Sequence, residues 1–386
     1  MSALVDPAWV NDQVNQLLDP LIARLDQPVA SKSVGILAGV SFLGSQQRFY
    51  SLHGSVPLEA GGSSAPEDIV MFIGSNTKVF TATLLGISQA MGPPYPDVST
   101  PVVGLLPSGI TIRQPHGQIL LWHLATHSAG FPTGVCGQHT FGAYPFTNMT
   151  AFLADFTPQY KPGEYWVYSN QGFALLGDLL SHAFHSRSSI NFDESYKQWP
   201  ALVMAKVVSQ LALTSTQVDY AAVADRIGQG YAFHDKQPSY ATVKPPTWML
   251  SSAGLGAGAL SSTLADMLSF LDAQIVPPGG DIGAGIRLTQ TPFPPGSQSP
   301  GPLHMGLGWQ IGNGYFDKNG GLGGYQSYMA FDPTSQIGVM VLGNTSGGTA
   351  GDALTVAGRK LLGALRKQPA DPSHFPHPKI TPACPP

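Results

Sequence analysis

Apolar residues recur along the chain at spacings that change from one region to the next. Near the N-terminus they recur every three or four residues, which predicts a helix carrying Val10, Val14, Leu17, Leu18, Leu21 and Leu25. Two apolar-rich runs follow, Val34 to Phe42 and Arg48 to His53, and we expect them to form the two strands of a hairpin. A helical pattern then covers residues 75–90.

The rest of the chain alternates between loop-rich and periodic segments. Residues from about 95 to 250 are rich in loops, with helical pieces such as Gln171–Phe184. Ala253–Ala273 predicts a loop leading into a helix, and Val276–Pro302 is so dense in Pro and Gly that we expect a long surface loop. Strand patterns return at Gly306–Ile311, Tyr325–Phe331 and Ile337–Leu342, and a last helix is expected at about 350–366.

Strands near both ends, with helices between them, predict an α/β (α+β) fold in which both termini build one sheet. The predicted sheet region comprises residues 1–75 and 251–370, and residues 76–250 form a mainly helical inserted region. The Pro-rich tail, residues 371–386, is expected to be loose.

Composition narrows the function classes. The chain has 386 residues, of which 43% are hydrophobic and 11% charged, which is typical of a folded protein with a large core. A net charge of -4 argues against a basic nucleic-acid surface. No apolar run reaches the length of a membrane span. The two cysteines, Cys136 and Cys384, would pair only in an oxidising compartment, and we expect two free thiols.

The strongest chemical signal is Ser75-Asn76-Thr77-Lys78 at the start of the helix predicted for 75–90. A spacing of three puts the Ser75 hydroxyl and the Lys78 amine on one helical face. A serine needs a neighbour to take its proton, and a desolvated lysine can do so because burial lowers its pKa. On its own the motif is weak, since an exposed lysine beside a capping serine gives the same pattern.

Two further motifs follow in order, Tyr168-Ser169-Asn170 and Lys318-Asn319-Gly320-Gly321. With them the chain resembles the serine β-lactamase and penicillin-binding-protein superfamily, and within it the class C β-lactamase branch. That branch carries Ser-x-x-Lys, Tyr-x-Asn and Lys-Thr-Gly in this order. The resemblance runs from about residue 33 to the C-terminal helix. Supporting segments include Leu120–Gly130, Ala257–Thr263, Gly306–Trp309 and Gly338–Asn344.

The resemblance implies a β-lactamase/transpeptidase-like fold, with an antiparallel sheet and the site in the cleft beside the helical region. Ser75 would be the nucleophile, and Lys78 and Tyr168 would handle its proton. Which of the two takes the first proton is left open. Two nearby ammonium groups would lower the pKa of Tyr168, which could then act as general base and activate the deacylating water.

The other motif positions would bind substrate. Asn170 offers an amide to Lys78 or to the substrate, and Lys318 would support Tyr168 and attract a carboxylate. Backbone N–H groups of Ser75 and Gly321 would form the oxyanion hole, and Gly320 would let the strand approach closely. Asn319 departs from the usual threonine, so the hydroxyl that helps bind a carboxylate is missing.

The function these features predict is a serine hydrolase that forms an acyl-enzyme, with β-lactams or D-amino-acid peptides as favoured substrates. The alternatives are a carboxylesterase or acyltransferase of the same fold, and a penicillin-binding sensor that stays acylated. We expect a small-molecule, short-peptide or ester substrate, no cofactor and no metal; the oligomeric state is not predicted. His123 and His127 lie four apart but lack a zinc-site pattern, so we expect structural roles for them.

Relatives of this kind are often exported. Residues 1–7 lack the basic start and apolar core of a secretory signal. We therefore expect a periplasmic or secreted protein if a leader has been removed, and a cytoplasmic protein otherwise.

Overall fold

The computed structural model describes residues 4–26, 34–136, 143–186, 192–234, 239–347 and 352–385. Residues 1–3 and the first two positions of the helix expected at 350–366 lie outside this range. The strands are β1 (Gly35–Phe42), β2 (Gln47–Gly54), β3 (Met71–Phe72), β4 (Gly230–His234), β5 (Ser239–Val243), β6 (Ser261–Ser262), β7 (Gln310–Ile311), β8 (Phe316–Leu322), β9 (Tyr325–Asp332), β10 (Ile337–Gly343) and β11 (Thr345–Ser346). The helices are α1 (Pro7–Asp26), α2 (Thr77–Met91), α3 (Leu121–Ala125), α4 (Phe146–Asp155), α5 (Asn170–His185), α6 (Phe192–Ser195), α7 (Trp199–Val203), α8 (Leu264–Ile275), α9 (Gly280–Thr289) and α10 (Ala353–Arg366).

The main sheet combines the two ends of the chain. Its strand order is β2-β1-β10-β9-β8-β7, and every neighbouring pair is antiparallel. Strand β1 pairs with β10, so that Val40 lies opposite Val339. The predicted hairpin, the N- and C-terminal helices and the late strands β9 and β10 are therefore confirmed. The division into a sheet region and an inserted region stays a prediction.

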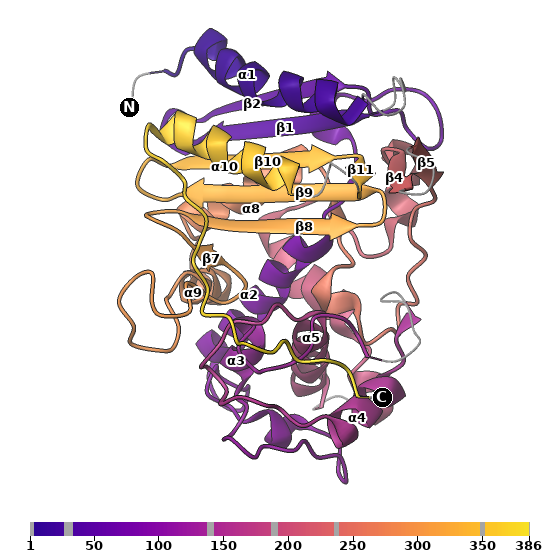
Figure 1. Ribbon diagram of the computed structural model, residues 1–386, viewed down its shortest axis with the longest axis vertical. Helices are drawn as coiled ribbons and strands as arrows, with labels where there is room; N and C mark the ends of the chain where they lie inside the picture. The colour runs from indigo at the N-terminus through magenta and orange to yellow at the C-terminus, as the bar shows by residue number, and fades with distance from the viewer. Residues whose placement is uncertain are drawn as a thin grey trace.

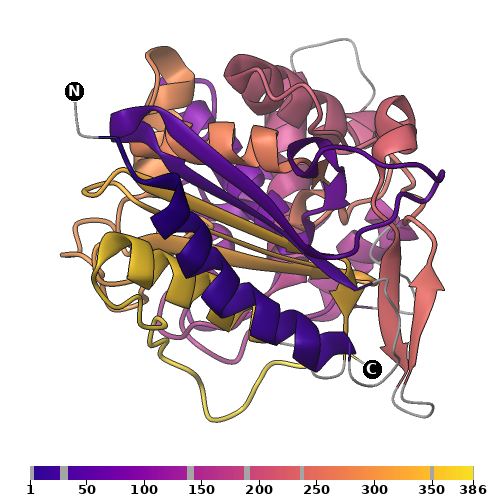
Figure 2. The same cartoon turned by 90° about the horizontal axis from the view of Figure 1, so that it is seen from above.

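Helices cover both faces of this sheet. In Figures 1 and 2, α1 and α10 lie together on one face, where their apolar sides share a core with Val40, Tyr328 and Val339. Helix α8 covers the opposite face against β1 and β10. Strands β1 and β10 are buried along their whole length because both faces are covered. In the part of the chain that the structure describes, no helix is long and apolar enough to cross a membrane.

Helix α2 runs from the sheet into the helical half of the molecule and is buried from Thr77 to Ser88 (Figure 1). A helix buried on all sides needs small residues where a neighbour comes close. Gly86 meets Gly285 of α9 in this way, since an ideal Cβ at Gly86 would lie 2.5 Å from the Gly285 carbonyl oxygen.

Two expectations in the region 276–311 are corrected. Residues Val276–Pro302 are not one long loop, because they include α9, which packs against α2. Gly285, one of the glycines that suggested a loop, lies directly against Gly86 and Ile87 of α2 in this contact. The strand expected over Gly306–Ile311 is limited to Gln310 and Ile311, because Gly308 adopts a φ of +76° and directs its N–H to the Ala125 carbonyl.

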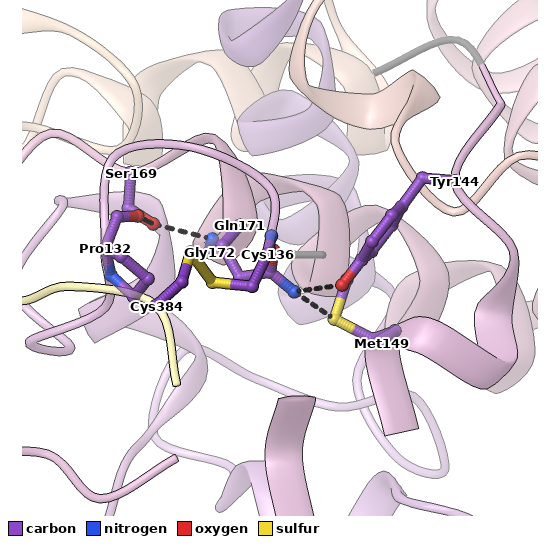
Figure 3. Close-up of a disulfide and its surroundings, with 8 residues drawn as sticks. All are labelled: Pro132, Cys136, Tyr144, Met149, Ser169, Gln171, Gly172 and Cys384. Carbon is purple, nitrogen blue, oxygen red and sulfur yellow. Dashed lines mark hydrogen bonds between the residues drawn. A yellow bond between two sulfur atoms is a disulfide. The ribbon is translucent and has the colours of Figure 1, made fainter. Parts of the chain in front are cut away.

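The C-terminal tail also differs from the expectation. Beyond α10 it passes β7 and crosses the front of α3 towards α5 and α4 (Figure 1). Cys136 and Cys384 form a disulfide, so the expectation of two free thiols is wrong (Figure 3). The pairing could not be predicted from the sequence, because the two cysteines are separated by 248 residues. They meet only because the tail returns to the helical half.

Candidate active site

Ser75 lies where the chain turns from β3 into α2. Gly74 and Ser75 form a 3-10 turn before the helix, with Gly74 at a φ of +49°. An ideal Cβ on Gly74 would lie 2.8 Å from the Gly321 nitrogen. Only glycine therefore allows the turn to approach β8 this closely, and the same approach brings Ser75 to the edge of the sheet.

Lys78 lies one helical turn after Ser75 and is fully buried. Its Nζ donates to Ser75 Oγ at 3.1 Å, to Asn170 Oδ1 at 2.7 Å and to the Ala257 carbonyl at 2.6 Å. Burial, helped by the charge of Lys318, holds the pKa of the Lys78 amine well below its usual range. The structure thus pairs the predicted nucleophile with an amine that loses its proton more readily than an ordinary lysine.

Tyr168 completes the contacts of the serine. Its hydroxyl is hydrogen-bonded to Ser75 Oγ. The Nζ atoms of Lys78 and Lys318 lie 4.9 and 5.3 Å from its ring centroid. Burial raises the pKa of Tyr168 to about 12, although the bond to Ser75 acts in the opposite direction. The expectation of a lowered pKa is therefore wrong, because desolvation by burial is the largest influence on this phenol.

Strand β8 places the third motif opposite the serine. Gly320 has no room for a side chain, since an ideal Cβ would lie 2.2 Å from the Ile73 carbonyl oxygen and 3.0 Å from the Ser75 nitrogen. Lys318 is buried, and its Nζ donates to the Asn319 carbonyl at 2.8 Å. Burial lowers the pKa of Lys318 to about 8. Asn319, Gly320 and Gly321 face the pocket, while the ammonium lies below its surface.

The edge of β8 is open beside these residues. In the described chain, β7 pairs only with Phe316 and Asp317 of β8. The following backbone, from Lys318 to Gly321, has β9 on one side and the pocket on the other. An extended substrate can therefore bond to this edge as an added strand.

A pocket of about 690 Å³ joins the three motifs. Its motif residues are Ser75, Tyr168, Asn170, Asn319, Gly320 and Gly321. Sequence reasoning missed its other walls, which include Arg359 of α10, Phe375 of the tail, Gln310 of β7 and Trp166. Arg359 donates through Nε to Asp317 Oδ2 at 2.6 Å and through Nη2 to Gln310 Oε1 at 3.0 Å. No local motif marks Arg359, because its partners come from β7 and β8.

His127 lies beneath Tyr168, with the two ring centroids 4.6 Å apart. Its Nδ1 accepts a hydrogen bond from the Ser169 nitrogen at 3.0 Å, and burial holds the pKa of the imidazole well below its usual range. A neutral His127 therefore supports the loop that presents Tyr168. Among the residues that the structure describes, no cluster of His, Cys, Asp and Glu could hold a metal ion.

The arrangement supplies the parts of an acyl-transfer site. Ser75 has a proton acceptor within reach, and two backbone N–H groups, of Ser75 and Gly321, lie on facing segments that meet at Gly74. Such facing donors can stabilise the oxyanion of a tetrahedral intermediate.

The chain is similar to known proteins of one family. The family model described as Beta-lactamase matches residues 25–363. A β-lactamase of Escherichia coli K12 is 23% identical over 381 residues, covering 89% of this chain and 91% of that protein. The D-alanyl-D-alanine-carboxypeptidase/endopeptidase AmpH of the same strain is 24% identical over 361 residues, covering 88% of this chain and 85% of that protein.

Solved structures show the same fold. A class C β-lactamase superposes with a TM-score of 0.74 at 18% identity, covering 94% of this chain and 98% of that one. A β-lactamase/D-alanine carboxypeptidase from Pseudomonas syringae superposes with a TM-score of 0.70 at 19% identity, covering 92% and 98% of the two chains.

Proposed function

The chain belongs to the β-lactamase family and is a serine hydrolase, and from this premise we propose that it hydrolyses β-lactams or D-amino-acid peptides through an acyl-enzyme on Ser75. The observation that carries the proposal is the convergence of Lys78 Nζ and the Tyr168 hydroxyl on Ser75 Oγ. Two groups able to move a proton thus contact one hydroxyl at the pocket surface.

The proposed reaction begins with proton transfer from Ser75 to Lys78, either directly or through Tyr168. The lowered pKa of Lys78 and the raised pKa of Tyr168 favour the amine as the resting proton acceptor. Ser75 Oγ then bonds to the carbonyl carbon, and the Ser75 and Gly321 N–H groups stabilise the oxyanion.

Collapse of this intermediate breaks the C–N bond, and the leaving nitrogen takes a proton from Tyr168. Tyr168 recovers it from Lys78. Water then attacks the acyl carbon and passes a proton to the same pair. The bond between the acyl carbon and Ser75 Oγ breaks, the pair returns the proton to Oγ, and the acid product leaves.

Arg359 supports substrates that carry a carboxylate. Its guanidinium lines the pocket, held by Asp317 and Gln310. Bidentate recognition of a carboxylate suits a guanidinium held in this way. Arg359 would then supply a positive charge that the buried Lys318 does not present to the pocket.

Asn319 favours a second candidate, a carboxylesterase. It stands where the family motif has threonine, so the site lacks that hydroxyl for a substrate carboxylate. Esters without a carboxylate do not need it.

Hydrolysis of a chromogenic cephalosporin tests the proposal. We expect turnover by the wild type and a loss of about 10³-fold or more in Ser75→Ala, since the nucleophile is removed. An unchanged melting temperature of the variant would show that the fold is intact. Turnover equal to wild type in Ser75→Ala would contradict the proposal.

Other outcomes identify the alternatives. Hydrolysis of a short-chain aryl ester without any cephalosporin turnover would indicate the esterase. A cephalosporin adduct on Ser75 that persists for hours, seen by mass spectrometry, would indicate a sensor.

A further inference from the structure

One wall of the pocket comes from outside the family match. We name residues Asp371–Cys384 the C-terminal strap. They follow the last matched residue, 363, yet Pro372, Ser373 and Phe375 line the pocket together with Ser75. The strap therefore lies beyond the residues that the family model matches, yet it contributes to the pocket.

The strap is held along its length. Ser373 Oγ donates to the Ile311 carbonyl at 3.0 Å, and the Trp166 nitrogen donates to the Pro376 carbonyl at 2.8 Å. The Tyr160 hydroxyl donates to the Ile380 carbonyl, and Cys384 forms the disulfide with Cys136. These contacts connect β7 with the helical half of the molecule, and the path of the tail between them can be followed in Figure 1.

Phe375 forms an aromatic wall beside the candidate proton-transfer groups. Its ring stacks on Trp166, with centroids 4.1 Å apart and an angle of 14° between the planes. The Trp166 ring lies 6.2 Å from the ring of Tyr168, which contacts Ser75. A substrate group that extends from the reactive carbonyl towards the strap must therefore meet a flat apolar surface.

The disulfide ties this wall to the helix that carries Asn170. The Cys136 nitrogen donates to Gln171 Oε1 at 3.1 Å, and Gln171 is the second residue of α5. Figure 3 shows the bridge beside Gln171, whose amide also reaches Tyr144 at 3.2 Å. The far end of the strap is thereby fixed to the same element as the substrate-binding side chain.

We propose that the C-terminal strap sets the size limit of the substrate, with Phe375 as the specificity-determining side chain and the Cys136–Cys384 disulfide keeping the wall closed. The enzyme would accept compact substrates with a small or flat apolar group facing the strap and disfavour long or branched ones. The inference rests on acyl transfer at Ser75 as proposed above.

Two pairs of cephalosporins test the size limit. In the first pair the leaving group is the same, and the acyl side chain is either acetyl or diphenylacetyl. In the second pair the acyl side chain is the same, and the leaving group carries the small or the bulky substituent. For each pair we would measure the ratio of kcat/KM for the bulky and the small member. The variants are Phe375→Ala, the paired Cys136→Ser/Cys384→Ser, and Ile380→Ala as a control. The Ile380 side chain is exposed and outside the pocket lining.

In Phe375→Ala we expect the bulky-to-small ratio of one pair to rise about tenfold or more, the range that one added or removed hydrophobic contact gives. The paired cysteine variant should shift the same ratio in the same direction, and Ile380→Ala should leave it unchanged. A structural role alone would lower both rates together and leave the ratio constant.

The inference is overturned if neither ratio moves in Phe375→Ala and in the cysteine variant while both hydrolyse the small substrate. Failure of the acyl-transfer proposal looks different, because the small substrate would then show no Ser75-dependent turnover in any variant. In that case matched acetyl and diphenylacetyl aryl esters replace the cephalosporins as probes, and the same ratio decides.

Discussion

Three ionisable side chains control the charge around Ser75. Lys78, Tyr168 and Lys318 are all removed from water, so burial is the largest cause of each pKa shift. Burial favours the neutral form of each group, and Lys78 and Tyr168 are the two that contact the serine. The pKa of Lys318, lowered to about 8, still leaves its amine protonated at neutral pH.

We expect kcat/KM to fall as the pH rises above about 8, because Lys318 then loses the positive charge that favours negative charge developing near Tyr168. Towards lower pH the rate should also fall, as Lys78 takes up a proton. A pH profile of cephalosporin hydrolysis measures both limbs. In Lys318→Met the alkaline limb should disappear and the plateau should be lower; the same limb in the variant would contradict the assignment.

Unfolding does not explain such an alkaline limb. Folding lowers the pKa of Lys318 from 10.5 to about 8, so the unfolded chain holds more protons between these values. The contribution of Lys318 to the free energy of unfolding therefore increases with pH in this window. Deprotonation of Lys318 therefore lowers the rate without destabilising the fold.

At the scale of elements, the contact between α2 and α9 holds in place the helix that follows the candidate nucleophile Ser75. Gly86 and Gly285 meet with no space for a side chain. We expect Gly86→Ala to lower the free energy of unfolding by about 1–3 kcal/mol, because the added methyl forces the helices apart. Thermal melting measures the effect. Gly104→Ala is the matched control, since an ideal Cβ there meets nothing within 4 Å, and an equal loss in both variants would refute the packing argument.

The same contact shows where sequence patterns succeed and fail. Helices such as α2 and α5 were predicted because their apolar residues recur with a regular period. Helix α9 was missed because its sequence, Gly280-Asp281-Ile282-Gly283-Ala284-Gly285, has the composition of a loop. Its Gly285 contacts Gly86, which is far away in the sequence, and no local pattern reveals such a contact.

In the candidate site, too, some features were predictable from the sequence and others were not. The identity of Ser75, Lys78, Tyr168 and Asn170 came from ordered motifs, and the structure brings these four side chains together. The pKa of Tyr168 could not be predicted, because it depends on burial by segments far apart in the chain. Their catalytic and binding roles stay predictions until variants are measured.

Across the whole molecule, both ends of the chain contribute to the main sheet, and the C-terminal end also lines the pocket. The N-terminal hairpin and the late strands close one sheet, in which β1 and β10 pair although about 300 residues separate them. The chain beyond α10 leads into the strap, which returns to the helical half (Figure 1). The sheet thus positions β8 behind Ser75, while the strap closes the pocket from the opposite half.

The disulfide should contribute to global stability as well as to the pocket wall. It closes a loop with a sequence separation of 248, which restricts the unfolded chain far more than the folded one. We expect Cys136→Ser/Cys384→Ser to lose about 2–4 kcal/mol of unfolding free energy. The secondary structure should persist, because neither cysteine belongs to a helix or strand. Thermal melting with far-UV circular dichroism tests this, and wild type that is reduced and alkylated should match the variant. Mass spectrometry should first verify that the bridge is present in the wild type. Equal melting temperatures of wild type and variant would then contradict the expected loss of stability.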